Sequence, residues 1–261
     1  MKPRIAIPIP NSTDSKYVMR ALPQYEHAVR EAGGEPVIID VTAPSNVIAQ
    51  KVKTCDGVLL PGSPADVDPE KFGAVRHEKT AAADARRDNA DELLLQDAYS
   101  MRKPIFGICY GMQSLNVWRT GTLDQHLATG VNHDAGRTVL KAHQVAIEPE
   151  SKLAAILRVA GALSADPSPK ITVNSSHHQA VDEPGDGLRL VAWCPADDVK
   201  EAVEGTADDH FVLCVQWHPE RTYDTDPASR ALFQAFVRAA AEWHKRLAAK
   251  QTDFESVPRK H

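Results

Sequence analysis

Short apolar runs alternate with amphipathic stretches through the first 120 residues. The pattern predicts strands at 4–10, 36–40, 56–62 and 104–108, and helices at 24–34, 44–52, 83–103 and 110–121. The strands are almost continuously apolar, which is typical of a parallel sheet that is covered on both faces. This β-α-β order predicts an α/β fold.

The second half of the chain has a different pattern. Its apolar stretches predict strands at 137–149, 170–174, 188–194, 199–205 and 210–220, a short helix at 152–160 and a long helix from 227 to 250. The alternation in the first of these strands indicates a half-exposed antiparallel strand. Asp226 and Pro227 suit the N-cap and first position of the last helix. We therefore expect one domain over 1–250 and a frayed tail over 251–261.

Composition narrows the function classes. The 261 residues carry a net charge of −5, which argues against a nucleic-acid partner or an anionic membrane. No apolar run is long enough to span a bilayer, and the N-terminus shows no signal peptide. The four cysteines show no CxxC spacing, so we expect free thiols, a cytoplasmic location and no cofactor.

One cysteine lies at a position that suits catalysis. In the stretch GICYG, Cys109 lies between Gly107 and Gly111, after a buried strand and before a helix. Flanking glycines allow the sharp turn of a nucleophile elbow. The N-terminus of the following helix should lower the pKa of the thiol, and the Tyr110 N–H could bind an oxyanion.

A nucleophilic cysteine needs a base and a group that orients the base. His218 follows the last buried strand, and Glu220 comes two residues later. In an extended chain these two side chains would point to the same side, so the carboxylate could hold the imidazole.

The stretches LLPGSPADVDP, GICYGMQSLNV and VQWHPE together resemble the class I glutamine amidotransferase superfamily. More narrowly, they resemble the free-standing hydrolases of the peptidase C26 family, the group related to gamma-glutamyl-gamma-aminobutyrate hydrolase. This resemblance covers nearly the whole chain. It implies a flavodoxin-like three-layer α/β sandwich, in which a mostly parallel central sheet carries a small antiparallel β addition. It also implies a catalytic triad of Cys109, His218 and Glu220.

The same resemblance implies further site residues. The Gly62–Ser63 turn would supply the second oxyanion donor beside Tyr110, with the Ser63 N–H preferred. Gln113 would bind the gamma-glutamyl part of the substrate. The loop NSSHHQAV would contact the substrate α-carboxylate, which we assign to His178 and Gln179. Relatives often have arginine where this chain has Tyr110, which could change the mouth of the site.

Other polar clusters favour structural roles. His133, His143, His177 and His178 show no metal-binding spacing, and adjacent histidines in a strand point apart, so we expect no metal site. Arg86, Arg87 and Asp88 at a helix start are typical of surface ion pairs, whereas the resemblance to the family implies a structural role at the entrance of the site. The loop 63–80 is long enough to be functional, and the sequence leaves open whether it closes over the site.

The sequence favours cysteine-dependent hydrolysis of a small gamma-glutamyl amine, through a thioester at Cys109. The alternative is a glutaminase subunit that supplies ammonia to a separate synthetase. An α/β-hydrolase is disfavoured because its acid precedes the histidine, and a non-catalytic binding protein is disfavoured by the intact triad. The amine half of the substrate and the formation of a homodimer are left open.

Overall fold

A computed structural model describes residues 2–255 of the chain, with side chains to residue 249. Five of its strands form a parallel half-sheet in the order β2-β1-β3-β4-β11. These strands are β1 (Arg4–Pro8), β2 (Glu35–Ile39), β3 (Gly57–Leu60), β4 (Ile105–Ile108) and β11 (Val212–Val215). The order is that of a flavodoxin-like sheet, whose carboxyl-end crevice is the usual position of a site.

An antiparallel extension continues the same sheet beyond β11. Its main strands follow in the order β10 (Lys200–Gly205), β9 (Leu188–Trp193), β6 (His143–Ile147) and β7 (Lys170–Val173). The short strands β5 (Leu123–Asp124) and β8 (Ala180–Val181) pair with each other, and β8 also pairs with β10. The extension places the loops before β6 and after β7 close to the end of β11.

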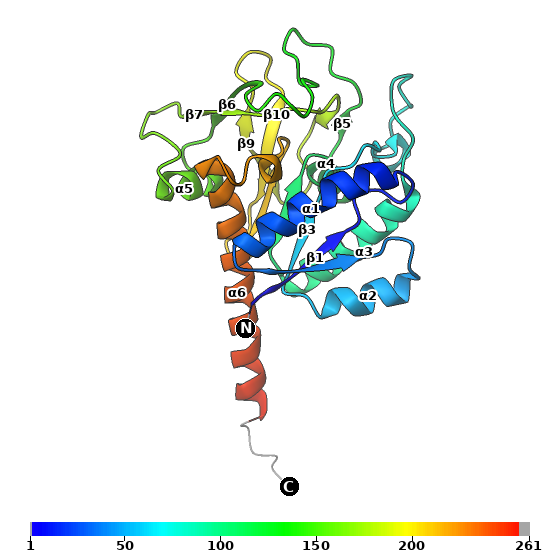
Figure 1. Cartoon of the computed structure of the whole chain (residues 1–261), viewed down its shortest axis with the longest axis vertical. Coiled ribbons are helices and arrows are strands. Elements are labelled where there is room, and N and C mark those ends of the chain that lie inside the picture. The colour runs from blue at the N-terminus through cyan, green and yellow to red at the C-terminus, as the bar shows by residue number, and fades with distance from the viewer. Residues whose placement is uncertain (1, 256–261) are drawn as a thin grey trace.

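Helices cover both faces of the sheet, which confirms the three-layer α/β sandwich (Figure 1). One face packs against α1 (Ser15–Glu31), α5 (Lys152–Val159) and α6 (Pro227–Glu255). The other face packs against α2 (Ser45–Lys53), α3 (Ala85–Met101) and α4 (Tyr110–Trp118). The two main apolar cores of the described residues therefore lie one on each side of the sheet, and a small third cluster lies around Ala180, Cys194 and Val199.

Several boundaries differ from the sequence expectation, and three of them are instructive. Helix α1 begins at Ser15, where the Asp14 carboxylate accepts a hydrogen bond from the Tyr17 N–H at 2.9 Å, and the helix continues through Pro23. Strand β6 covers only 143–147. Helix α6 continues to Glu255, so the first part of the predicted tail is helical, and 256–261 lie outside the described residues.

Within residues 2–255, no helix has both the length and the apolar character that crossing a membrane would require.

Candidate active site

Cys109 occupies the tight turn between β4 and α4, as the sequence predicts. Its backbone has φ 52° and ψ −109°, a conformation that residues other than glycine rarely adopt. The turn is held by the Cys109 N–H, which donates to the Val215 carbonyl oxygen at 2.8 Å. A strained backbone that is fixed in this way is characteristic of functional positions.

The two flanking glycines are required by close packing. A Cβ on Gly107 would lie 2.6 Å from Sγ of Cys214, and a Cβ on Gly111 would overlap the Leu60 carbonyl group. Strands β3 and β4 therefore approach the first turn of α4 more closely than any side chain would permit. This packing directs Cys109 toward the carboxyl end of the sheet.

The protonation state of Cys109 differs from the sequence expectation. Burial raises the pKa of its thiol to about 12, although the nearby Arg221 guanidinium and the Tyr110 N–H both act to lower it. The thiol is only 6% exposed, so desolvation of a thiolate outweighs these favourable interactions. Cys109 is therefore a neutral thiol that needs a base, and the expected lowering of its pKa is wrong.

His218 is a suitable base. Burial lowers the pKa of its imidazole below the ordinary value, against the opposing effect of Glu220, so the ring is neutral near pH 7. Nδ1 of His218 lies 2.8 Å from Oε1 of Glu220, which fixes the Nδ1–H tautomer and leaves Nε2 as the proton acceptor. Both side chains are 2% exposed.

The pairing of His218 with Glu220 is confirmed, but its local geometry differs from the predicted one. Residues Pro219–Arg221 form a single 3-10 turn rather than an extended strand. Asn174 fixes the start of this turn, because its side chain accepts from the His218 N–H at 2.9 Å and donates to the His218 carbonyl at 2.8 Å. No spacing or motif in the sequence indicates this role for Asn174.

Gly62 lies beside both reactive side chains, with no room for a side chain of its own. A Cβ on Gly62 would lie 3.0 Å from Cε1 of His218 and 3.5 Å from Cβ of Cys109. The Gly62 N–H donates to the Tyr25 hydroxyl at 3.0 Å, so it is not available to an oxyanion. The Ser63 N–H is then the donor that this turn can offer, beside the Tyr110 N–H at the start of α4.

The Tyr110 side chain points away from the site mouth, which corrects the sequence expectation. It is 1% exposed, its hydroxyl donates to Asp88, and the Arg87 guanidinium lies 5.0 Å from its ring centroid. The replacement of arginine by Tyr110 therefore changes the packing of α3 against α4. It leaves only the Tyr110 backbone at the site.

Arg87 is fully buried, which overturns the expectation of a surface ion pair. It pairs with Asp91 at 2.7 Å and donates to the carbonyl oxygens of Pro10 at 2.8 Å and Pro61 at 2.7 Å. These bonds fix the backbone immediately before the Gly62–Ser63 turn. Sequence position alone could not reveal this burial.

Gln113 and Gln179 meet beside the elbow. The Gln113 side-chain amide donates to the Gln179 carbonyl at 2.9 Å and to the Gln216 side chain at 3.2 Å. Both Gln113 and Gln179 are buried. The Gln179 backbone thus belongs to this cluster, whereas its side chain donates to the Gln125 carbonyl at 3.1 Å.

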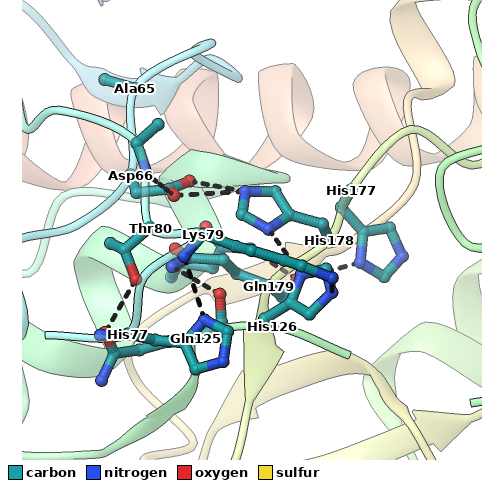
Figure 2. Close-up of polar contacts among 12 residues, drawn as sticks. Ala65, Asp66, His77, Lys79, Thr80, Gln125, His126, His177, His178 and Gln179 are labelled. Carbon is teal, nitrogen blue, oxygen red and sulfur yellow. Dashed lines mark hydrogen bonds and ion pairs between the residues drawn. The ribbon is translucent and has the colours of Figure 1, made fainter. Parts of the chain in front are cut away.

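His178 faces the long loop (Figure 2). Its Nε2 lies 3.1 Å from a carboxylate oxygen of Asp66, whereas His177 lies on the opposite side of the backbone. The loop is further attached where Thr80 donates to the Gln125 side chain at 2.8 Å. Loop 63–80 is thus packed against the segment that carries His178 and Gln179. The hydrogen bond between Asp66 and His178 raises the pKa of the His178 imidazole.

Comparison with known proteins agrees with these features. The model of the peptidase C26 family matches residues 9–220. Protein NtpR of Enterococcus hirae is 32% identical over 82% of this chain and 87% of its own length. Gamma-glutamyl-gamma-aminobutyrate hydrolase PuuD of Escherichia coli K12 is 31% identical over 83% of this chain and 84% of its own length.

The fold has more distant counterparts among solved structures. A putative GMP synthase subunit from Thermoplasma acidophilum superposes with a TM-score of 0.61 at 15% identity, covering 95% of this chain and 98% of that one. The structure of PurLQS from Thermotoga maritima superposes with a TM-score of 0.57 at 17% identity, covering 91% of this chain and 99% of that one. These likenesses concern the fold alone, whereas the matches in sequence establish that the chain belongs to the peptidase C26 family.

Proposed function

We propose that the protein hydrolyses the gamma-glutamyl amide bond of a small gamma-glutamyl amine, with Cys109 as the nucleophile. The observation that carries the proposal is that a Cβ on Gly62 would meet both the strained Cys109 and His218 of the His218–Glu220 pair, which puts these two side chains next to the same backbone position. Membership of the C26 family, and relatives named as gamma-glutamyl-gamma-aminobutyrate hydrolases, support a hydrolase that acts on amide bonds.

In the first half-reaction, Nε2 of His218 accepts the Cys109 thiol proton as Sγ attacks the amide carbon. The carbonyl oxygen becomes an oxyanion that accepts hydrogen bonds from the N–H groups of Tyr110 and Ser63. His218 then gives the proton to the leaving nitrogen, the carbon–nitrogen bond breaks, and the amine departs. A gamma-glutamyl thioester remains on Cys109.

In the second half-reaction, neutral His218 accepts a proton from water, and the hydroxide attacks the thioester carbon. A second oxyanion forms in the same place. Its collapse breaks the carbon–sulfur bond, Sγ takes the proton from His218, and glutamate is released. Glu220 remains ionised throughout and stabilises the imidazolium in both halves.

The positive charge near the site favours an anionic substrate. Burial and then the charges of Arg221 and Arg20 lower the pKa of the half-buried Arg137, while Tyr17 and Glu220 act to raise it, so this guanidinium lies within electrostatic range of Glu220. Gamma-glutamyl-gamma-aminobutyrate carries a carboxylate on its amine half, unlike gamma-glutamyl-putrescine. We therefore infer a preference for an amine half that ends in a carboxylate.

The test is glutamate release from glutamine, gamma-glutamyl-gamma-aminobutyrate, gamma-glutamyl-putrescine and a polyglutamate. Wild type, Cys109→Ala and the control Cys55→Ala are compared, because Cys55 is also a buried thiol but lies against helix α2. We expect turnover of a gamma-glutamyl amine that is abolished only in Cys109→Ala. Unchanged turnover in that variant would disprove the proposal.

The glutaminase alternative predicts a different pattern. Glutamine would then be the substrate, and turnover would require or increase strongly with an added synthetase. Turnover of gamma-glutamyl-gamma-aminobutyrate by the chain alone, with glutamine ignored, excludes this alternative.

A further inference from the structure

Three histidines from separate segments surround one buried carboxylate. His133 comes from the loop before β6, His143 is the first residue of β6, and His177 follows β7. Their ring nitrogens lie 3.2, 3.3 and 3.6 Å from Oε1 of Glu201, which is in β10. All four side chains are at most 6% exposed.

The outer nitrogen of each ring has its own acceptor. Nδ1 of His143 lies 3.2 Å from the Gln144 carbonyl oxygen, and Nδ1 of His177 lies 2.9 Å from the Gln179 carbonyl oxygen. A carbonyl oxygen can only accept, so both rings carry their proton on Nδ1. Nε2 of His133 lies 2.9 Å from the Asp197 carboxylate, which favours a proton on that nitrogen.

The other nitrogen of each neutral ring, which faces Glu201, therefore presents a lone pair. The Glu201 carboxylate also offers only lone pairs. Nδ1 of His133, Nε2 of His143, Nε2 of His177 and both Glu201 oxygens are buried, and none has a hydrogen-bond partner among the described residues. Acceptors that face each other at a buried position repel each other and lose the solvation that they would have in water. A cation between them would turn the same arrangement into an attractive one.

The spacing fits a tetrahedral metal ion. The four candidate ligand atoms all lie within 4.8 Å of one another. Ligands about 2.0–2.1 Å from a zinc ion stand about 3.3 Å apart in a tetrahedron, close to the separations from Glu201. A metal-bound histidine usually donates its other N–H to a carbonyl or a carboxylate, which is the pattern of all three rings.

We propose that His133, His143, His177 and Glu201 form a structural binding site for a divalent transition metal, with Zn²⁺ as the favoured ion. Imidazole and carboxylate ligands suit this class of ion. Four protein ligands in a closed, buried site leave no open position for catalysis. The proposal revises the expectation of no metal site and does not depend on the proposed reaction.

The metal site would stabilise the segment 174–179, which contacts the candidate active site. The Gln179 carbonyl that accepts from His177 also accepts from Gln113 at 2.9 Å. The Asn174 side chain, three residues before His177, holds both backbone groups of His218. Binding of the ion would therefore connect strand β10 to two parts of the active site.

A proton is the competing cation. Burial acts to lower the pKa of His133, but the neighbouring carboxylates of Glu201 and Asp197 raise it overall, which favours an imidazolium at this position. One proton would satisfy one lone pair of the three. It would leave His143 and His177 facing the carboxylate unprotonated.

The experiment measures metal in the full-length protein. Elemental analysis of purified wild type should give one equivalent of metal per chain, and chelation followed by Zn²⁺ addition should lower and then restore the Tm. Co²⁺ added to the metal-free protein should give the intense visible absorption of a tetrahedral site. The affinity for the metal should fall by at least about tenfold in His177→Asn and in Glu201→Gln. The control His27→Asn replaces an exposed histidine outside the cluster and should keep the affinity of wild type.

The wild-type titration keeps the proposal falsifiable even if a cluster variant fails to fold. Metal-free wild type that is fully stable, binds neither Zn²⁺ nor Co²⁺ stoichiometrically and shows no change in Tm would overturn it. Such a result would assign the cluster to a shared proton. Full metal content in a folded His177→Asn variant would also overturn it.

Discussion

Glu220 holds His218 through a single short contact, 2.8 Å between Oε1 and Nδ1, in a turn where both side chains are buried. The second carboxylate oxygen of Glu220 has no hydrogen-bond partner among the described residues. Oε1 of Glu220 also lies 3.6 Å from Nε of Arg221, so the carboxylate holds the imidazole closely and pairs with this guanidinium at longer range. Its charge acts where the imidazolium would form during the reaction.

Glu220→Gln should lower kcat by about 10²–10⁴-fold, because the amide keeps the size of the side chain but removes the charge that stabilises the imidazolium. KM should change little. Steady-state kinetics on the preferred gamma-glutamyl amine measures this effect, with the exposed Glu183→Gln as control. A variant within twofold of wild type would remove Glu220 from the proposed triad.

The expected pH dependence of kcat/KM follows from a resting site in which the Cys109 thiol and the His218 imidazole are both neutral. Burial lowers the pKa of His218, so the base is active above that pKa and is lost as the pH falls through it. The acid limb of kcat/KM should therefore lie below about pH 6.5, the ordinary value for histidine.

Alkylation provides an independent check on the thiol. Burial raises the pKa of Cys109 to about 12, so the rate of its reaction with iodoacetamide should keep rising above pH 9. Mass spectrometry locates the modified residue. A rate that levels off near pH 6 would instead indicate a preformed thiolate–imidazolium pair.

Gly62→Ala tests the close packing around the two reactive residues. The new methyl group would lie 3.0 Å from Cε1 of His218 and 3.2 Å from the Tyr25 hydroxyl, so His218 must shift. We expect kcat to fall by about 10–100-fold, because small displacements of catalytic groups are costly. Gly130→Ala is the matched control, since nothing lies within 4 Å of its new Cβ. Equal kcat values for the two variants would contradict the expectation.

Arg87→Met should destabilise the fold by about 3–5 kcal/mol, because it leaves the buried Asp91 carboxylate without its partner. Urea unfolding measures the loss, with the exposed neighbour variant Arg86→Met as control. The double variant Arg87→Met/Asp91→Leu should recover part of the stability. If the single variant matched the control, Arg87 would not support the Pro61 turn.

Arg137→Gln tests the preference for an anionic amine half. It should raise KM for gamma-glutamyl-gamma-aminobutyrate by about tenfold, since a hydrogen bond to a charged group contributes on the order of 1.5–3 kcal/mol, and the half-buried Arg137 would contribute at the lower end of that range. KM for gamma-glutamyl-putrescine should change much less. Arg238→Gln, on the exposed side of α6, is the control. An equal loss for both substrates would place Arg137 at the glutamate half instead.

Much of the local structure followed from the sequence because it depends on residues that are close along the chain. The glycines around Cys109 predicted the elbow, and the two-residue spacing predicted the contact of His218 with Glu220. The apolar runs predicted the α/β sandwich. The start of α1 was missed because a helix that passes through Pro23 has no strong signal in the sequence.

Tertiary structure decided the features that depend on distant segments. Only the folded sheet shows that Tyr110 points inward, that Arg87 is buried under the Pro61 turn, and that burial outweighs the helix N-terminus at Cys109. The three histidines around Glu201 carry no recognisable spacing, because each comes from a different segment and the antiparallel extension brings them together. Local spacing specifies contacts within a turn or a strand, whereas the burial and partners of a polar group depend on which segments pack around it.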